Sequence, residues 1–350
     1  MPNAEQLVDR ICNSRYCSVF DLVRGYYQIP LARESQRYVA ISTPFGTFTW
    51  TRMPLGLKNA PMFFQRMMDQ VLAGAEEYSG VYLDDMAVDS QSWDGHLAHL
   101  NDVLTRIGKA NLKIRPKKSQ LGLAKVLYLG KEVGSGTISP QGEKISCIQR
   151  FPLPNTKKEL RGYLGLTGYY HRWIPMYASV AATLTDMLRK KSPDKLIWSG
   201  EGRKAFAELK AHLVRKPIMR GPDYTKGFIL QCDASGIAIG CVLGQQDSEG
   251  DYVIAYASRK LSECERRYHS VEQEMLAILF GLEKFKVYLW NQPVEIWTDC
   301  NPLKYLDSVS QSKNLRLARW AMILQPYQHC IKHKSGKLNG NCDSLSRIEI

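Results

Sequence analysis

Apolar residues recur at helical spacing in two early segments of the chain. In residues 61–75 the apolar positions are Phe63, Phe64, Met67, Met68 and Val71. In residues 94–110 they are Leu97, Leu100, Val103, Leu104 and Ile107. Intervals of three and four residues place such side chains on one face of a helix, and Pro61 suits a first helical turn. We predict two amphipathic helices that serve as scaffold and pack in a core.

Shorter runs of apolar, β-prone residues predict strands. Residues 80–83 and 86–88 flank Asp84 and Asp85, which is the pattern of a hairpin with two carboxylates at its tip. Residues 17–22 form another such run and contain Asp21. Residues 228–235 and 294–300 also read as strands, whereas residues 270–288 read as a helix.

The hairpin acids suggest metal chemistry. Asp21 precedes Asp84 by 63 residues and can join the pair from a neighbouring strand. Adjacent ionised acids repel each other, so three carboxylates at one place favour a divalent cation. Oxygen ligands select Mg²⁺ or Mn²⁺, and two such ions suit nucleotidyl transfer by in-line displacement. An ordinary turn is the alternative reading of an Asp-Asp pair.

A second set of acids lies in the last third of the chain. Its members are Asp233, Glu274, Asp299 and Asp343, at intervals of 41, 25 and 44 residues. Acids among residues that read as buried are costly unless a cation or a hydrogen-bond donor meets them. We therefore expect these four acids, from separate elements, to form a second metal site. Each one taken singly has an alternative as a cap, a turn or a surface charge.

The charge distribution points to a polyanionic partner. The 350 residues carry a formal net charge of +13, and 44% of them are hydrophobic, so more than one core is expected. Residues 105–191 hold 17 Lys or Arg and 4 Asp or Glu, so this stretch accounts for the whole excess of +13. We expect it to contact phosphates, with a merely solvated basic face as the alternative. The aromatic residues within it, expected mainly to fill a core, are Tyr163, Tyr169, Tyr170 and Trp173.

Cysteine and apolar patterns bear on the compartment. Nine cysteines show neither a CxxC pair nor zinc spacing with histidine, so an intracellular, reducing environment is expected. The longest apolar run, residues 276–282, is too short to cross a bilayer. No membrane partner is expected, and the location within the cell is unknown.

Several motifs carry a resemblance to a known family. FDLVRGYYQIPL at residues 20–31, MPLGLKNAP at 53–61 and YLDDMAV at 82–88 resemble three successive motifs of a reverse transcriptase. YLGKEV at 128–133 and FPLPNTKKELRGYLGLTGYYHRWI at 151–174 are similar to the thumb and connection of gypsy-type LTR retrotransposon Pol polyproteins. The second set of acids resembles the ribonuclease H domain that follows the polymerase in these elements. The resemblance covers nearly the whole chain.

The resemblance implies an α/β architecture in three parts. These are an α+β palm of a right-hand polymerase with partial fingers at residues 1–133, a helix-rich thumb and connection at 134–220, and a ribonuclease H-like α/β domain at 221–347. The chain begins in a motif that resembles the middle of a reverse transcriptase, so the first fingers strands are expected to be missing and polymerase activity is in doubt. The implied partners are an RNA template, a DNA primer, an RNA:DNA hybrid, deoxynucleoside triphosphates and other Pol segments.

The resemblance also assigns roles to single residues. Asp21, Asp84 and Asp85 would hold two polymerase metal ions, and the four later acids would hold two nuclease ions. Tyr26 would be the steric gate against a ribose 2′-hydroxyl, and a core tyrosine is the alternative. The other implied roles are a nucleotide-approaching loop at Gly56, with a plain turn as the alternative; pyrophosphate assistance by Lys118, with Lys117 beside it; and proton transfer or product release by His333, with a structural histidine as the alternative.

Other interpretations remain open at this point. The chain could be a non-catalytic nucleic-acid-binding remnant of a retroelement, which would bind nucleic acid in a salt-dependent way and release no products. A pararetroviral polymerase is also compatible with the motifs. A replicative or telomere polymerase is disfavoured by the nuclease-like segment.

Overall fold

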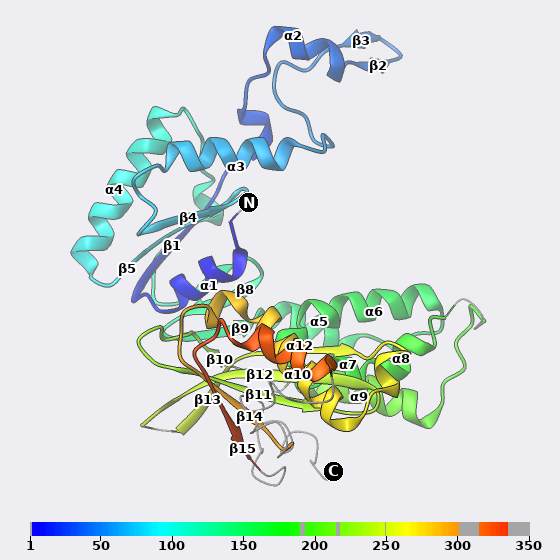
Figure 1. The fold of residues 1–350 in the computed structure, drawn as a ribbon. Helices are drawn as coiled ribbons and strands as arrows, with labels where there is room; N and C mark the ends of the chain where they lie inside the picture. Colours follow the sequence, from blue (N-terminus) through cyan, green and yellow to red (C-terminus); the bar gives the residue numbers. More distant parts are fainter. Residues whose placement is uncertain (1, 190–192, 215–217, 249, 301–314, 335–350) are drawn as a thin grey trace. The chain divides into compact units, whose positions relative to one another are not determined.

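The computed structural model describes residues 2–189, 193–214, 218–248, 250–300 and 315–334 (Figure 1). The chain folds into two compact units, a first unit of residues 1–141 and a second unit of residues 142–350. Among the described residues, no helix has both the length and the apolar character needed to cross a membrane.

The first unit is built on a four-stranded antiparallel sheet in the order β4-β5-β1-β6. Its strands are β1 (Tyr16–Asp21), β4 (Ser79–Tyr82), β5 (Asp85–Ser90) and β6 (Gln120–Leu123). The strands predicted at residues 17–22, 80–83 and 86–88 are therefore confirmed to within a residue or two. The central pair, β1 and β5, is almost entirely buried because helices or further strands cover both of its faces.

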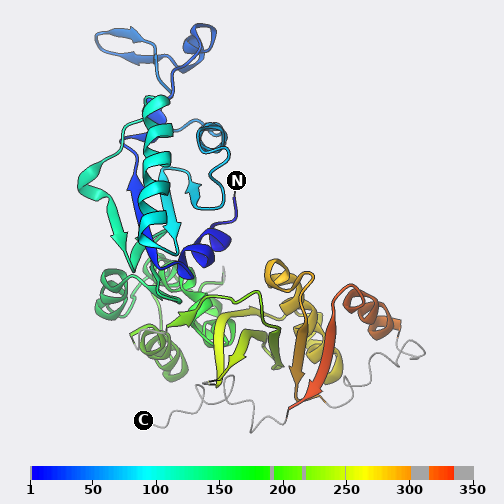
Figure 2. The same cartoon turned by 90° about the vertical axis from the view of Figure 1, so that its left-hand side faces the viewer.

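Helices α3 and α4 cover one face of this sheet (Figure 2). The helices of the first unit are α1 (Ala4–Cys12), α2 (Arg33–Gln36), α3 (Ala60–Val71) and α4 (Trp93–Lys109). Helix α4 begins where the Ser92 hydroxyl caps the Gly95 N–H at 3.2 Å, and its last turn carries Arg106 and Lys109, which suit the helix dipole. The shared core contains Phe20, Phe64, Met68, Met86, Val88, Val103 and Ile107.

The two amphipathic helices exist as predicted, but their buried faces are narrower than expected. Phe63 is exposed, because it lies one residue, about 100° of helical rotation, from the buried Phe64. Leu97 and Leu104 are also exposed, whereas His96 of the same helix is fully buried. The prediction that these three apolar side chains lie in the core is therefore wrong. The first helix also ends at Val71, four residues before the predicted end.

Side-chain hydrogen bonds from α3 stabilise the turn between β4 and β5. Tyr82 pairs with Asp85, so Leu83 and Asp84 form a two-residue turn, and Leu83 has a left-handed φ of 57°. The buried Gln65 side chain accepts a hydrogen bond from the Leu83 N–H at 2.9 Å and donates one to the Val81 carbonyl at 3.0 Å. These two contacts stabilise a turn in which a bulky, non-glycine residue takes an unfavourable left-handed conformation.

Smaller elements complete the first unit. A two-stranded hairpin projects from it (Figure 1). The remaining strands are β2 (Ile41–Thr43), β3 (Gly46–Phe48), β7 (Val126–Tyr128), β8 (Lys131–Gly134) and β9 (Thr137–Pro140). Three 3₁₀ turns are η1 (Gly25–Gln28), η2 (Arg37–Val39) and η3 (Pro116–Lys118). Strands β7, β8 and β9 form an antiparallel meander.

The second unit contains a five-stranded mixed sheet in the order β13-β12-β11-β14-β15. Its strands are β11 (Phe228–Ala234), β12 (Ala238–Asp247), β13 (Gly250–Lys260), β14 (Val294–Thr298) and β15 (His329–His333). The short strand β10 (Met219–Arg220) is not part of this sheet. Strands β11, β14 and β15 are parallel, so their carboxyl ends lie at one edge of the sheet.

Helices make up the rest of the second unit. They are α5 (Gly142–Arg150), α6 (Lys157–Tyr169), α7 (Tyr177–Val180), α8 (Ala182–Asp186), α9 (Gly200–Val214), α10 (Ser270–Lys284), α11 (Lys286–Leu289) and α12 (Leu315–Leu324), with 3₁₀ turns η4 (His171–Trp173) and η5 (Glu265–Arg267). Tyr163, Tyr170 and Trp173 are buried as predicted, whereas Tyr169 is half exposed. Helix α10 packs on β11 and β12, and this contact positions Glu274.

Candidate active sites

Strand register brings the first three acids together. Asp21, the last residue of β1, lies directly opposite Asp85, the first residue of β5. Asp84 occupies the adjoining turn, and its carbonyl oxygen accepts a hydrogen bond from the Leu22 N–H at 3.4 Å. We call Asp21, Asp84 and Asp85 the first carboxylate group.

The first carboxylate group carries an excess of negative charge. Burial raises the pKa of Asp85, and the neighbouring charges of Asp84 and Asp21 raise it further, while Lys118 acts in the opposite direction. The buried Oδ2 atom of Asp21 accepts no hydrogen bond from the described residues, although two cationic side chains approach it. Carboxylate oxygens in such surroundings fit a divalent cation, which would relieve the repulsion and fill the unmet coordination.

Two basic side chains approach the same group. The Arg115 Nη1 atom lies 3.3 Å from Asp21 Oδ2, and the Lys118 Nζ atom lies 4.0 Å from it. The Arg115 N–H also donates to the Asp21 carbonyl oxygen at 2.8 Å, which links η3 to the end of β1. The sequence did not single out Arg115, and the only available signal was its place in the basic run before Lys117 and Lys118.

Tyr26 and Gly56 have distinct surroundings. The Tyr26 ring packs edge-on against Phe64 at a centroid distance of 5.5 Å, and burial followed by the Asp84 charge raises the pKa of its hydroxyl. Tyr26 is only partly buried, so it both borders the core and faces the first carboxylate group. Gly56 lies in an exposed turn with a φ of +93°, a conformation that favours glycine.

Three acids of the second set, Asp233, Glu274 and Asp299, lie near the carboxyl edge of the parallel strands. Gln231 pairs with Trp297, so Asp233 near the end of β11 and Asp299 just after β14 occupy equivalent places on neighbouring strands. Asp233 is partly exposed and Asp299 is exposed, which corrects the expectation of acids enclosed within strands. Only Glu274, on α10, is buried. We call Asp233, Glu274 and Asp299 the second carboxylate group.

Glu274 occupies a buried, negatively charged environment. Its Oε1 atom accepts a hydrogen bond from the Ala234 N–H at 3.1 Å, whereas its buried Oε2 atom has no partner in the part of the chain that the structure describes. Burial, followed by the charges of Asp299 and Asp233, raises the pKa of Glu274 to about 8. An orphaned carboxylate oxygen beside two further carboxylates fits a divalent cation by the same argument.

The other nuclease candidates are only partly described. The exposed His333 ring contacts the Asp299 carbonyl oxygen through Nε2 at 3.0 Å, so it lies at the same edge of the sheet. Asp343 lies outside the described residues. Within the described ranges, no three His, Cys, Asp or Glu side chains converge as a ready metal-binding group. Charged carboxylates repel one another, so we expect ligand distances to form when a cation binds.

Two family models match the chain. Residues 2–133 match the model described as reverse transcriptase (RNA-dependent DNA polymerase). Residues 223–327 match the model described as the RNase H-like domain found in reverse transcriptase. The first match contains the whole first carboxylate group, and the second match contains the whole second group.

Full-length relatives agree with these matches. The chain is 36% identical to the retrovirus-related Pol polyprotein from transposon 297 of Drosophila melanogaster, over 100% of this chain and 33% of that protein. It is 35% identical to that from transposon opus of the same species, over 99% of this chain and 36% of the relative. The transposon Tf2-3 polyprotein of Schizosaccharomyces pombe is 32% identical, over 99% of this chain and 26% of that protein. The chain thus spans about a third of these relatives or less.

Solved structures share the fold. The foamy viral protease-reverse transcriptase in complex with double-stranded DNA superposes with a TM-score of 0.83 at 21% identity, covering 95% of this chain and 59% of that one. The foamy viral protease-reverse transcriptase in complex with an RNA/DNA hybrid superposes with a TM-score of 0.78 at 21% identity, covering 94% of this chain and 45% of that one. Taken together, the two family matches and these relatives show that the chain carries a reverse transcriptase domain and an RNase H-like domain, and that its homologues are Pol polyproteins of LTR retrotransposons.

Proposed function

We propose that the chain catalyses RNA-directed DNA synthesis in its first unit and hydrolysis of RNA in RNA:DNA hybrids in its second unit. The observation that carries the proposal is the β1–β5 register, which sets Asp21 opposite Asp85 and beside Asp84. The second carboxylate group, at the carboxyl edge of the parallel strands, supports the nuclease activity in the same way.

Each carboxylate group would hold two Mg²⁺ or Mn²⁺ ions. Asp21, Asp84 and Asp85 would be the ligands in the first unit, and Asp233, Glu274, Asp299 and Asp343 those in the second. Bound ions of this kind activate an attacking oxygen and stabilise the departing one in phosphoryl transfer. The residues themselves supply the fixed negative charge, and the buried Gln65 contacts keep the Asp84 turn in place.

Further residues would position the substrates of the first unit. Tyr26 packs on Phe64 and faces Asp84, a place suited to crowding the 2′-hydroxyl of an incoming nucleotide. The positive φ of Gly56 suits a loop that approaches the nucleotide closely. The exposed Lys118 lies 4.0 Å from Asp21, close enough to assist departure of pyrophosphate, and His333 would serve the nuclease step beside Asp299.

The proposed partners are an RNA template, a DNA primer, their hybrid and deoxynucleoside triphosphates. The excess of +13 in residues 105–191 supports binding to phosphates. Complexes of the foamy viral relative with double-stranded DNA and with an RNA/DNA hybrid support partners of this class. We also propose residues 1–133, 134–220 and 221–347 as palm, thumb with connection, and nuclease domain, and other Pol segments as further partners.

Primer extension and hybrid cleavage test the proposal. The whole chain is given a DNA primer on an RNA template with deoxynucleotides and Mg²⁺, and Asp84→Asn serves as the control for synthesis. We expect extended primer and shortened RNA, and both should disappear when a chelator removes the metal. Salt-dependent binding without either product would reject the enzyme and favour a non-catalytic remnant.

A further inference from the structure

A buried histidine of α4 connects the two strands that carry the first carboxylate group. His96 is fully buried, and its Nε2 atom lies 2.8 Å from the Ser18 hydroxyl of β1. Its Nδ1 atom lies 3.0 Å from the Ser90 hydroxyl of β5. Both serines are themselves buried. The roles proposed above for the reaction do not explain why His96 bridges two serines in the buried layer between α4 and the sheet.

The hydrogen-bonding capacity of this bridge is satisfied by its neighbours. A neutral imidazole donates at one nitrogen and accepts at the other, so two hydroxyl groups complete it. Ser18 Oγ also accepts the Gly122 N–H at 2.9 Å, and Ser90 Oγ also contacts His99 Nδ1 at 2.8 Å. His99 in turn stacks on Tyr78 at a centroid distance of 3.9 Å. Loss of His96 would leave two buried hydroxyls without this partner.

The bridge spans a diagonal pair of positions that depends on the strand register. Ser18 pairs with Val88, and Ser90 pairs with Tyr16, so the two serines are diagonal neighbours on the face covered by α4. The same register sets Asp21 opposite Asp85. A slip of one residue would turn every side chain to the other face, but a slip of two residues would keep the alternation of buried side chains. Apolar packing therefore discriminates poorly against a two-residue slip, which would break the diagonal bridge.

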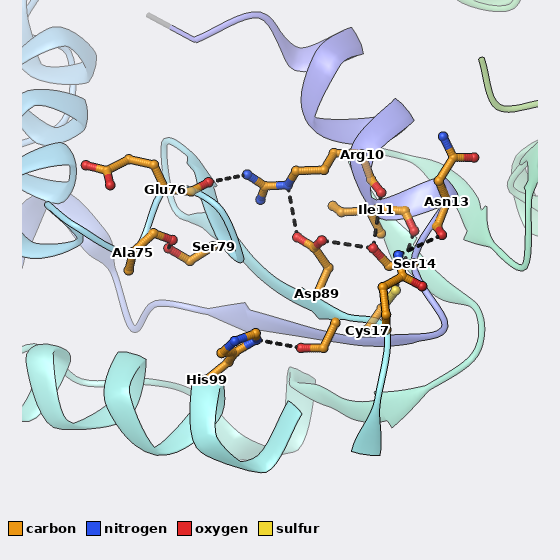
Figure 3. Close-up of polar contacts among 12 residues, drawn as sticks. Arg10, Ile11, Asn13, Ser14, Cys17, Ala75, Glu76, Ser79, Asp89 and His99 are labelled. Atoms are coloured by element: carbon orange, nitrogen blue, oxygen red, sulfur yellow. Dashed lines mark hydrogen bonds and ion pairs between the residues drawn. The ribbon is translucent and has the colours of Figure 1, made fainter. Parts of the chain in front are cut away.

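A second polar contact holds the same end of β5 on the other side. Figure 3 shows Arg10 and Ser14 reaching Asp89, while His99 approaches the strand from α4. The Arg10 Nε and Ser14 Oγ atoms lie 3.0 Å and 2.9 Å from the Asp89 carboxylate. These contacts anchor β5 to α1 and to the segment after it. The His96 bridge adds a side-chain link between β5 and β1 to the backbone pairing of these strands.

We propose that His96 is a positioning residue for nucleotidyl transfer, which selects the β1–β5 register by bridging Ser18 and Ser90 and so places Asp21 opposite Asp85. The inference rests on the proposed polymerase function. His96 does not touch the reacting groups, because it lies at the far end of the strands from the hairpin tip. A buried polar group can act by selecting one strand register rather than by adding stability.

Single-turnover primer extension by the whole chain distinguishes these two roles. His96→Leu keeps an apolar side chain of similar size, whereas His96→Gln offers an amide nitrogen and oxygen that can bridge both hydroxyls. We expect His96→Leu to lower the rate constant of extension by about 10- to 100-fold, since small displacements of reacting groups are costly. Nucleotide affinity and hybrid cleavage should stay within about twofold, and His96→Gln should recover most of the rate constant.

The outcome that overturns the inference is a normal rate constant with a smaller burst amplitude in His96→Leu, because that pattern means only a smaller folded fraction. Amide–amide NOEs between β1 and β5 provide a readout that needs no catalysis. The wild type and His96→Gln should show Ser18 paired with Val88, and His96→Leu should show a shifted or doubled set. If the wild type extends no primer, the proposed function fails, yet unchanged NOEs in His96→Leu would still refute the register claim.

Discussion

The negative charge of the two carboxylate groups is compensated in different ways. In the first unit, Arg115 and Lys118 approach Asp21, and the acids lie at the tip of a hairpin. In the second unit, Glu274 is buried beside Asp233 and Asp299, and its pKa is raised to about 8. The first group is thus partly neutralised by side chains of its own unit. In the second group, a proton or a metal ion would neutralise the buried Glu274, whose Oε2 atom has no hydrogen-bond partner among the described residues.

The largest expected effect separates the two groups in one chain. Asp84→Asn should lower the rate of primer extension by about 10³-fold or more. The substitution weakens the binding of metal ions that stabilise the transition state by several kcal/mol. Hybrid cleavage by the same protein should be unchanged. Asp233→Asn should give the reverse pattern and leave hybrid binding nearly intact. Loss of both activities in either variant, measured on one doubly labelled hybrid, would contradict two separate sites.

The next expected effect is a difference between the two carboxylate groups in the pH dependence of their Mn²⁺ affinity. Glu274 must lose its proton to bind metal, so Mn²⁺ affinity of the second group should rise about tenfold per pH unit and level off above about 8. In the first group, burial and the charges of Asp84 and Asp21 raise the pKa of Asp85 while Lys118 lowers it, so we expect a different pH dependence of Mn²⁺ affinity there. Titrations of Mn²⁺ between pH 6 and pH 9, an interval of about three units chosen to bracket that pKa, measure both dependences.

The same pKa shift predicts a trend in stability. Folding raises the pKa of Glu274 from 4.5 to about 8, so the folded, metal-free unit keeps a proton that the unfolded chain releases. Stability should be greatest below about 4.5 for this group and should fall as the pH rises through about 8. Glu274→Gln should remove this slope in thermal unfolding of the second unit. An unchanged slope in that variant would assign the trend to other groups.

The smallest predicted effect concerns the support of the hairpin tip. Gln65→Leu should destabilise the first unit by about 1–3 kcal/mol, because the Leu83 N–H and the Val81 carbonyl lose their buried partner. Denaturant unfolding measures the change, and primer extension should fall while hybrid cleavage persists. Gln70→Leu, at an exposed position of the same helix, is the matched control. Equal effects of the two substitutions would remove Gln65 from the account.

Local pattern was sufficient to predict the strands and the acids that they carry. Short β-prone runs beside Asp21, Asp84 and Asp85 marked β1 and the β4–β5 hairpin, and the motifs around them indicated the chemistry. The pattern failed where burial depends on distant packing. Phe63, Leu97 and Leu104 repeat at helical spacing but lie on exposed faces, because the helices bury only narrow stripes.

The supporting residues had no local signal beyond ordinary polarity or charge. Arg115 reaches Asp21 only because η3 leads into β6, which pairs with β1. Gln65 reaches Leu83, and His96 reaches Ser18, across sequence separations of 18 and 78 residues. In a single sequence Gln65 and His96 look like ordinary polar positions of amphipathic helices, and Arg115 looks like one of several residues in a basic run. Their contacts follow from tertiary packing, which local periodicity does not encode.

The most direct test of the two-group account is Mn²⁺ binding followed by electron paramagnetic resonance, with the wild type, Asp84→Asn and Asp233→Asn compared at one pH. The account predicts two classes of bound Mn²⁺ in the wild type, one lost in Asp84→Asn and the other lost in Asp233→Asn. A single class, or two classes that survive both substitutions, would contradict the claim that these carboxylates form separate metal sites.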